Sequence, residues 1–231
     1  MEKVRINGMG TLGTSLKDNL EKSKDCYLVE NKKQSDPYVN YNNTIIHTSW
    51  LTNVDYCENN RKEAEFYCIR PLKKLIKLCE KYDMKLIFIS SAYVFSGDLP
   101  VDMSYSVSCL KNPINFYGRL KSQAEEMIQD SKIEKWNIVR TDNIYSKNKK
   151  PIYKKGATDW ISTPTEVGFL SEKIISLIEK GTTNQIHHFV GDEKLSRFDF
   201  LKRFNENIKP CKGRELKLSA KRPINSCLKP T

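Results

Sequence analysis

The sequence of 231 residues predicts an α/β fold, a doubly wound parallel sheet followed by a small C-terminal subdomain. Two observations carry this prediction. Short runs rich in β-branched residues alternate with stretches of helical spacing up to residue 145, and this alternation implies right-handed crossovers between parallel strands. Beyond that point the alternation loosens, so we expect a core at residues 1–145 and a smaller region at 146–231 that is interleaved with the core.

The expected elements follow one another along the chain. Strands are expected at residues 3–7, 26–30, 43–49, 84–91 and 136–141, and helices at 11–23, 60–82 and 113–126. Pro71 is expected to bend the second of these helices. In the second half we expect a loop at 147–165, a helix at 166–181, a strand at 186–191 and a helix at 196–207 that Ser196 caps.

The composition excludes several classes of protein. Apolar runs such as residues 86–89 are too short to span a bilayer, and the N-terminal residues lack the apolar core of a signal peptide. The seven cysteines form no C-x-x-C pair and do not cluster with the three histidines. We therefore expect a cytoplasmic protein with free thiols, no membrane association and no metal site.

The net charge of +11 raises the question of nucleic-acid binding. The lysines are scattered and mostly interleaved with acidic residues, as on ordinary solvated faces. We expect no nucleic-acid partner. A basic protein also attracts smaller ligands rich in phosphate, including dinucleotides and nucleotide sugars.

A glycine-rich turn follows the first expected strand. Gly8, Gly10 and Gly13 fill the pattern G-x-G-x-x-G between a strand and a helix. Such glycines let the backbone approach a pyrophosphate at the helix N-terminus, whereas the alternative is an ordinary glycine turn. The pattern favours a Rossmann-like dinucleotide site, with a loop formed by Gly8, Met9, Gly10, Thr11, Leu12 and Gly13.

The end of the second expected strand bears on the choice of coenzyme. Glu30 lies where a carboxylate reaches the adenosine ribose hydroxyls, and Asn31 follows it. A carboxylate there repels the 2′-phosphate of NADPH, although Lys32 and Lys33 follow and offer cations for that phosphate. We expect either NADH or NADPH to bind, with NADH favoured.

Three further side chains are candidates for chemistry. Tyr117 and Lys121 are four residues apart in an expected helix and therefore share one face. They form either a core edge with a solvated cation or a pair in which the cation lowers the pKa of the phenol, and spacing alone leaves both interpretations open. Ser91 ends the strand at 84–91, and the carboxyl ends of such strands line the ligand crevice.

Together, Ser91, Tyr117 and Lys121 match the catalytic set of the short-chain dehydrogenase/reductases. The chain further resembles the extended sugar-nucleotide branch of that superfamily, in particular the dTDP-4-dehydrorhamnose reductase family. Six ordered blocks carry this resemblance: IIHTSWLTNVDYCE (45–58), SSAYVFSG (90–97), PINFYGRLK (113–121), VRTDNIY (139–145), STPTEVG (162–168) and RPINSCL (222–228).

This resemblance implies NAD(P)H-dependent reduction of a 4-keto-6-deoxy sugar nucleotide, and it leaves a homodimer open. Tyr117 would protonate the nascent alkoxide, Lys121 would lower the pKa of Tyr117 and hold the nicotinamide ribose, and Ser91 would bind the carbonyl oxygen. The implied coenzyme contacts also include Thr48, Ser49 and Trp50. The implied substrate contacts are Thr52, Val54, Ser91, Ala92, Tyr93 and Asn143.

Departures from the family pattern keep two alternatives open. Ala92 and Asn143 replace an aspartate and a tryptophan of the family, and the chain is shorter than the family pattern on its substrate side. Ala92 and Tyr93 also disfavour dehydration and epimerisation at neighbouring carbons. The alternatives are a nucleotide-sugar 4-epimerase and a non-catalytic dinucleotide-binding subunit, like the regulatory subunit of methionine adenosyltransferase.

The three histidines are expected to carry no catalysis. His47 stands where the family has asparagine and is a candidate neighbour of the coenzyme. His187 and His188 lie in an expected strand, so we expect one buried and one exposed imidazole.

Overall fold

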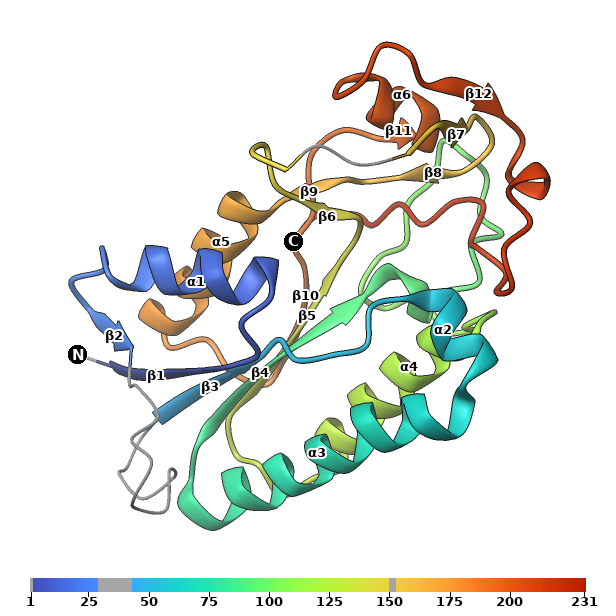
Figure 1. Ribbon diagram of the computed structural model, residues 1–231. Helices are drawn as coiled ribbons and strands as arrows, with labels where there is room; N and C mark the ends of the chain where they lie inside the picture. The colour runs from blue at the N-terminus through green and yellow to red at the C-terminus, as the bar shows by residue number, and fades with distance from the viewer. Residues whose placement is uncertain (1, 29–42, 150–152) are drawn as a thin grey trace.

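The computed structural model describes residues 2–28, 43–149 and 153–231 (Figure 1). A six-stranded sheet in the order β10-β5-β4-β3-β1-β2 forms its centre, and every pairing in it is parallel. This confirms the predicted α/β fold. The strands are β1 (Glu2–Asn7), β2 (Cys26–Leu28), β3 (Asn43–His47), β4 (Lys85–Ser91), β5 (Trp136–Thr141) and β10 (Gln185–His188).

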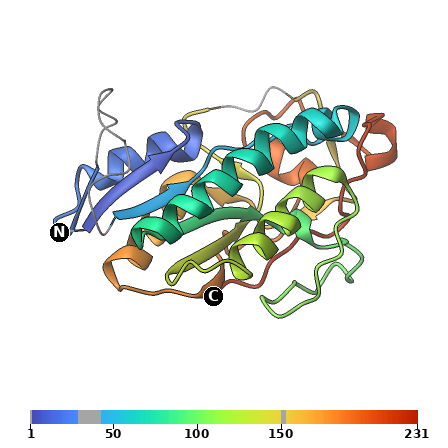
Figure 2. The same ribbon diagram turned by 90° about the horizontal axis from the view of Figure 1, so that it is seen from below.

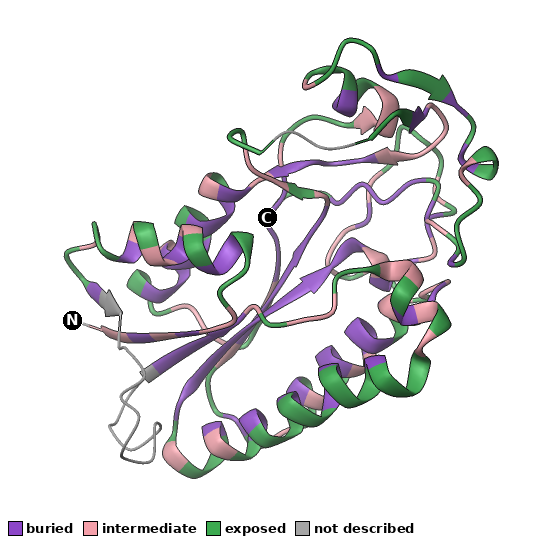
Figure 3. Cartoon of the chain, in the orientation of Figure 1, coloured by how far each residue is buried: buried purple, intermediate pink, exposed green. Residues whose placement is uncertain are grey.

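Helices cover both faces of this sheet (Figure 1). One face is covered by α1 (Thr11–Leu20) and α5 (Val167–Glu179), and the other by α3 (Arg61–Tyr82) and α4 (Phe116–Gln129). Figure 2 shows α3 and α4 lying side by side across the second face. Because both faces are covered, all seven residues of β4 are buried, and Figure 3 shows burial concentrated along the sheet.

Local capping explains where several helices begin. Asn115 accepts a hydrogen bond from the Gly118 amide at 2.8 Å, which starts α4 at the residue before Tyr117. Ser196 accepts from the Asp199 amide at 3.0 Å, so the predicted cap of α6 (Arg197–Lys202) is confirmed. The helix α3 continues through Pro71 as one element.

The short helix α2 (Val54–Asn59) precedes α3 and was not expected. Asn53 caps it by accepting from the Tyr56 amide at 3.0 Å. Its six residues are too few for a helical period to show in the sequence.

Small paired strands lie around α6 at one end of the molecule and between that end and the central sheet (Figure 1). The expectation of a loop at residues 147–165 is wrong, because this segment contains two whole strands and the first residue of a third. Each strand here has two or three residues and pairs with a distant part of the chain, so no local periodicity marks it. The elements are β6 (Ile144–Tyr145), β7 (Lys155–Ala157), β8 (Ile161–Ser162), β9 (Thr165–Glu166), β11 (Leu195–Ser196), β12 (Lys209–Cys211) and the 3-10 turn η2 (Gly213–Leu216).

The C-terminal segment returns to the edge of the central sheet. The amide of Thr231 donates to the His188 carbonyl at 3.2 Å, and Nδ1 of His188 lies 3.2 Å from the Lys229 carbonyl. His187 is buried as well, with Nε2 3.2 Å from Oδ1 of Asn137. The expectation of one exposed imidazole is therefore wrong, because α5 and the returning segment enclose both sides of β10.

Candidate active site

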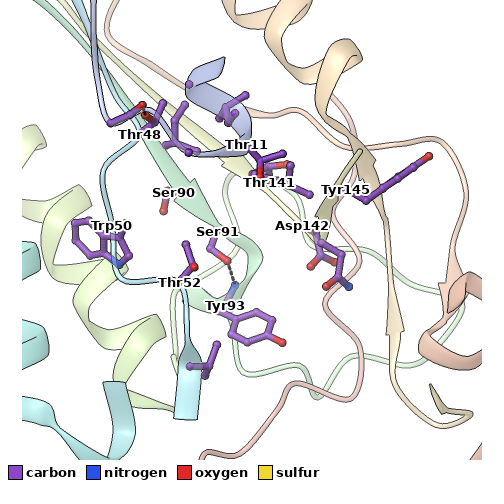
Figure 4. Close-up of a pocket in the computed structure, with 18 of the residues that line it drawn as sticks. Thr11, Thr48, Trp50, Thr52, Ser90, Ser91, Tyr93, Thr141, Asp142 and Tyr145 are labelled. Carbon is purple, nitrogen blue, oxygen red and sulfur yellow. Dashed lines mark hydrogen bonds between the residues drawn. The ribbon is translucent and has the colours of Figure 1, made fainter. Parts of the chain in front are cut away.

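The candidate site lies at the carboxyl edge of the sheet, where β1 pairs with β2 on one side and with β3 on the other. The helices that follow β1 and β3 cover opposite faces, so this position is a topological switch point, where open α/β sheets bind ligands. A cavity of about 1060 Å³ opens here. In Figure 4, Trp50 and Tyr145 line opposite sides of it.

The glycine turn after β1 forms one end of the cavity, and all six predicted loop residues line it. Gly8 has a φ of +119°, and a Cβ atom there would meet the Ser49 amide nitrogen at 2.5 Å. A Cβ atom on Gly13 would meet the Gly8 carbonyl oxygen at 2.0 Å. Both positions therefore require glycine for the chain's own packing.

Gly10 differs from the other two glycines. A Cβ atom built on it meets nothing within 4 Å in the described part of the chain. Gly10 is also the N-cap of α1, whose first turn lines the cavity and presents free backbone amides. Open space beside a helix N-terminus suits a phosphate, so this end of the cavity fits the pyrophosphate of a dinucleotide.

The loop after β3 supports the glycine turn. The Thr48 hydroxyl donates to the Gly8 carbonyl at 2.6 Å, and the Ser49 amide donates to the Asn7 carbonyl at 2.8 Å. Thr48, Ser49 and Trp50, all predicted coenzyme contacts, line the cavity.

The predicted catalytic residues come together on the same cavity. Ser91 ends β4, whereas Tyr117 and Lys121 lie on α4, and all three line the wall. Ser91 lies beside Tyr117 and acts to lower its pKa, and it accepts from the Tyr93 amide at 3.2 Å. Nζ of Lys121 donates to the Ile89 carbonyl at 2.6 Å.

The expected effect of Lys121 on Tyr117 is wrong. Burial raises the pKa of Tyr117 above its usual value, and the hydrogen bond with Ser91 offsets only part of that shift. Burial also lowers the pKa of Lys121 to about 7. Nζ lies 6.0 Å from the Tyr117 ring centroid and donates to a carbonyl, and burial is the largest influence on the pKa of Tyr117.

Two expected neighbours of the site lie behind its wall. Ala92 is fully buried and does not line the cavity, so it is not positioned as a substrate contact. His47 is 2% exposed, with Nδ1 3.1 Å from Nδ2 of Asn7 and its ring stacked on Phe88. Burial, followed by the charge of Lys121, lowers the pKa of His47 to about 4. Glu30 and Asn31 lie outside the described residues.

The opposite end of the cavity was only partly predicted. Thr52, Val54, Tyr93 and Asn143 line it as expected. The lining residues that the sequence analysis missed include Asp142, Tyr145, Ser146, Lys149, Tyr153, Arg197 and Phe200. Asp142 could have been predicted from the sequence, because it follows β5 just as Ser91 ends β4. Arg197 and Phe200 come from α6, and no local signal links that helix to the sheet.

Asp142 is a buried carboxyl in the cavity wall. Its Oδ2 atom accepts from the Ser226 hydroxyl at 2.7 Å and from the Thr163 amide at 3.1 Å. Burial raises the pKa of Asp142 to about 7 in spite of these hydrogen bonds. The group therefore changes protonation near neutral pH.

Neither a membrane-spanning helix nor a metal cluster occurs in the described part of the chain. Within residues 2–28, 43–149 and 153–231, no helix combines the length and apolarity needed to cross a membrane. Over the same ranges, no cluster of three or more histidine, cysteine or carboxylate side chains is suited to a metal ion.

A doubly wound parallel sheet with this cavity at its switch point is the architecture of the dinucleotide-binding short-chain dehydrogenase/reductase class. Within that class the chain belongs to the RmlD substrate binding domain family, whose model matches residues 6–231.

Similar proteins are reductases of dTDP sugars. A dTDP-4-dehydrorhamnose reductase of Mycolicibacterium smegmatis is 27% identical over 70% of this chain and 53% of its own length. A dTDP-4-keto-6-deoxy-D-glucose reductase of Streptomyces niveus is 26% identical over 50% of this chain and 43% of its own. The chain thus spans about half the length of these curated relatives.

The crystal structure of dTDP-4-dehydrorhamnose reductase from Bacillus anthracis in complex with NADP superimposes with a TM-score of 0.84. The match has 27% identity and covers 100% of this chain and 91% of that one. The dTDP-4-dehydrorhamnose reductase of Yersinia enterocolitica, at 22% identity and a TM-score of 0.83 over 99% of this chain and 90% of that one, shows the same fold.

Proposed function

We propose that this protein reduces the keto group of a 4-keto-6-deoxy sugar nucleotide with NAD(P)H, as a step in deoxysugar biosynthesis. The observation that carries the proposal is one cavity that reaches the glycine turn at one end and Ser91, Tyr117 and Lys121 at its centre. The names of the relatives, dTDP-4-keto sugar reductases, support the substrate class.

The glycine turn would hold the coenzyme. The free amides at the start of α1 and the open space beside Gly10 suit its pyrophosphate. The relative from Bacillus anthracis, which holds NADP, supports the same class of coenzyme. When bound, NAD(P)H supplies a hydride to the carbonyl carbon.

Tyr117 would donate the proton that the carbonyl oxygen takes up. A phenol is protonated at neutral pH, as a proton donor must be, and burial raises the pKa of Tyr117 further. Ser91 would hydrogen-bond the same oxygen, and its contact with Tyr117 supports this pairing. Lys121 would hold the coenzyme ribose.

The substrate would occupy the end of the cavity formed by Thr52, Val54, Tyr93 and Asn143. On this reading, residues 1–145 form the coenzyme-binding core and 146–231 the substrate side. The core carries 21 basic and 19 acidic residues, whereas residues 146–231 carry 18 basic and 9 acidic ones. Most of the net positive charge therefore lies in the region proposed to meet the anionic nucleotide.

Compartment and assembly follow from the same proposal. All seven cysteines are free, which supports a reducing cytoplasm. A homodimer is the assembly that we propose, and light scattering coupled to size-exclusion chromatography measures it.

Turnover on a panel of substrates tests the proposal. The purified protein, NADH or NADPH, and a set of dTDP- and UDP-linked 4-keto-6-deoxy sugars are mixed, and the loss of reduced coenzyme is followed by absorbance. We expect oxidation on at least one dTDP sugar. Coenzyme binding without oxidation on any member would contradict the proposal and favour a regulatory subunit. Interconversion of nucleotide hexoses without net coenzyme loss would favour a 4-epimerase.

A further inference from the structure

Lys121 is held in an unusual way for a buried cation. It is 4% exposed, and it has no ion-pair partner among the residues that the structure describes. Its one hydrogen bond to a described residue goes to the Ile89 carbonyl at 2.6 Å. A buried ammonium with a single neutral acceptor is costly unless another group stabilises the charge.

Two aromatic rings supply that stabilisation. Nζ of Lys121 lies 4.0 Å from the centroid of Trp50 and 4.8 Å from that of Phe88. The rings meet edge to face, with centroids 5.5 Å apart and an interplanar angle of 71°. The negative face of an indole attracts a cation more strongly than any other side-chain ring, and more so in a desolvated site.

The orientation of Trp50 is not explained by packing alone. Its Nε1 atom is buried and has no hydrogen-bond partner within the described ranges. A buried donor without a partner is unfavourable, and a phenylalanine would place a ring here without one. The face of the indole, however, lies under the ammonium and attracts it.

We propose that Trp50 is a positioning residue that keeps the ammonium of Lys121 charged and holds it at the cavity wall. The contact is independent of any reaction, whereas its effect on turnover rests on the function proposed above. Trp50 acts here through Lys121, in addition to any contact of its own with coenzyme.

Other titratable groups also face Lys121, and their titrations must be distinguished from that of Lys121. They are Tyr117 and Glu125 on α4, Cys57 on α2, Cys68 on α3 and His47 on β3. Burial raises the pKa of Cys57 to about 11 and raises that of Cys68 and Tyr117, whereas the pKa of His47 is lowered to about 4. Glu125 is paired with Arg140 at 2.7 Å. Within this cluster a titration near neutral pH belongs to Lys121, whose pKa is lowered to about 7. Asp142 lines the same cavity with a pKa raised to about 7, so the pH measurements are repeated in Asp142→Asn to remove its contribution.

The emission of Trp50 tests the contact without turnover. The spectrum of Trp50 is obtained by subtracting that of Trp50→Phe from that of the wild type across neutral pH. We expect a titration with a midpoint near neutrality that is absent in Lys121→Met. A flat wild-type difference spectrum, or a midpoint that persists in Lys121→Met, would overturn the proposal.

The pH profile of turnover tests the consequence. Activity that needs charged Lys121 falls as pH rises through the pKa of that group. We expect Trp50→Leu to move this alkaline limb down by about 0.5 to 1.5 pH units, and Trp50→Phe to move it less. Trp136→Leu is the matched control, because Trp136 packs against the same apolar cluster but lies away from the cavity.

These outcomes separate the inference from the proposed function. If the alkaline limb of the pH profile of turnover is unshifted in both Trp50 variants, the positioning role is overturned. If no substrate is turned over, the proposed reaction fails while the emission titration still decides the contact. Should Trp50→Leu not fold, as judged by circular dichroism, the limb of Trp50→Phe decides the role.

Discussion

In the proposed reaction the hydroxyl of Tyr117 donates a proton to the substrate. The Tyr117 ring lies edge-on to Tyr93, with centroids 5.9 Å apart. Tyr117→Phe removes that hydroxyl and leaves the ring contact. We expect kcat to fall by about 100-fold or more, the usual size of a general-acid contribution, with an unchanged coenzyme Kd.

Steady-state kinetics and coenzyme titration measure both quantities. Tyr67→Phe is the matched control, because Tyr67 is an exposed phenol on α3 outside the cavity. Turnover of Tyr117→Phe close to that of the wild type would refute the assigned role.

Coenzyme choice is also decided by single side chains, and Glu30 is the residue on which our prediction rests. A carboxylate that binds the ribose hydroxyls disfavours a 2′-phosphate, so NADH should bind more tightly than NADPH by about 5- to 150-fold. Dissociation constants of both coenzymes for wild type and Glu30→Ala measure this. Tighter NADPH binding by the wild type, with no gain in Glu30→Ala, would show that the nearby lysines dominate.

Among the elements, the glycine turn allows a matched pair of substitutions. Gly10→Ala places a methyl group in open space, so the fold should persist while the coenzyme loses its close approach and binds at least several-fold more weakly. Gly13→Ala places a methyl group 2.0 Å from the Gly8 carbonyl oxygen, so it should also lower the melting temperature.

Thermal unfolding and coenzyme titration of the two variants separate these effects. If Gly10→Ala binds coenzyme as tightly as the wild type, the pyrophosphate does not lie beside Gly10.

The elements that the sequence predicted are those with a clear period or a strong boundary signal. β1, β3, β4, β5, α3 and α5 were found because their apolar residues recur at strand or helix spacing. The helix α2 was missed because it is short, and the strands β7 and β8 were missed because they are short and pair with distant strands. Pairing between segments far apart in sequence produces no periodic pattern in the local sequence.

The same distinction applies to the candidate site. The glycines, Ser91, Tyr117 and Lys121 follow motifs whose spacing is local, so the sequence revealed them. Arg197 reaches the cavity through the packing of α6, which no motif predicts. The pKa directions of Tyr117 and Lys121 were also beyond the sequence, because burial sets them and burial is a property of the folded chain.

At the scale of the whole molecule, Asp142 joins the end of β5 to the segment before β9 and to the C-terminal segment, through Thr163 and Ser226. Its pKa is raised to about 7 by burial, above the value of an unfolded aspartate, which is about 3.9. The stability that the neutral carboxyl contributes is therefore complete below about pH 4 and is lost as pH rises through about 7.

Asp142→Asn removes this titration and keeps a polar side chain of the same size. The free energy of unfolding of the wild type relative to Asp142→Asn should fall by up to about 4 kcal/mol between about pH 4 and 8. Urea unfolding across this range measures it, with Asp192→Asn, an exposed carboxyl, as the control. A difference that does not change with pH would show that Asp142 does not titrate in this window.

The transfer of deuterium from the coenzyme to the sugar decides whether the whole molecule is a reductase. The protein is incubated with reduced nicotinamide coenzyme deuterated on its transferable position and a dTDP-4-keto-6-deoxy sugar, and the product is examined by mass spectrometry and NMR. We expect one deuterium, bound to the carbon that carried the keto group, and none when Tyr117→Phe replaces the wild type over the same brief reaction. A product without deuterium at that carbon, or no product from any dTDP- or UDP-linked 4-keto-6-deoxy sugar, would contradict the proposed reduction.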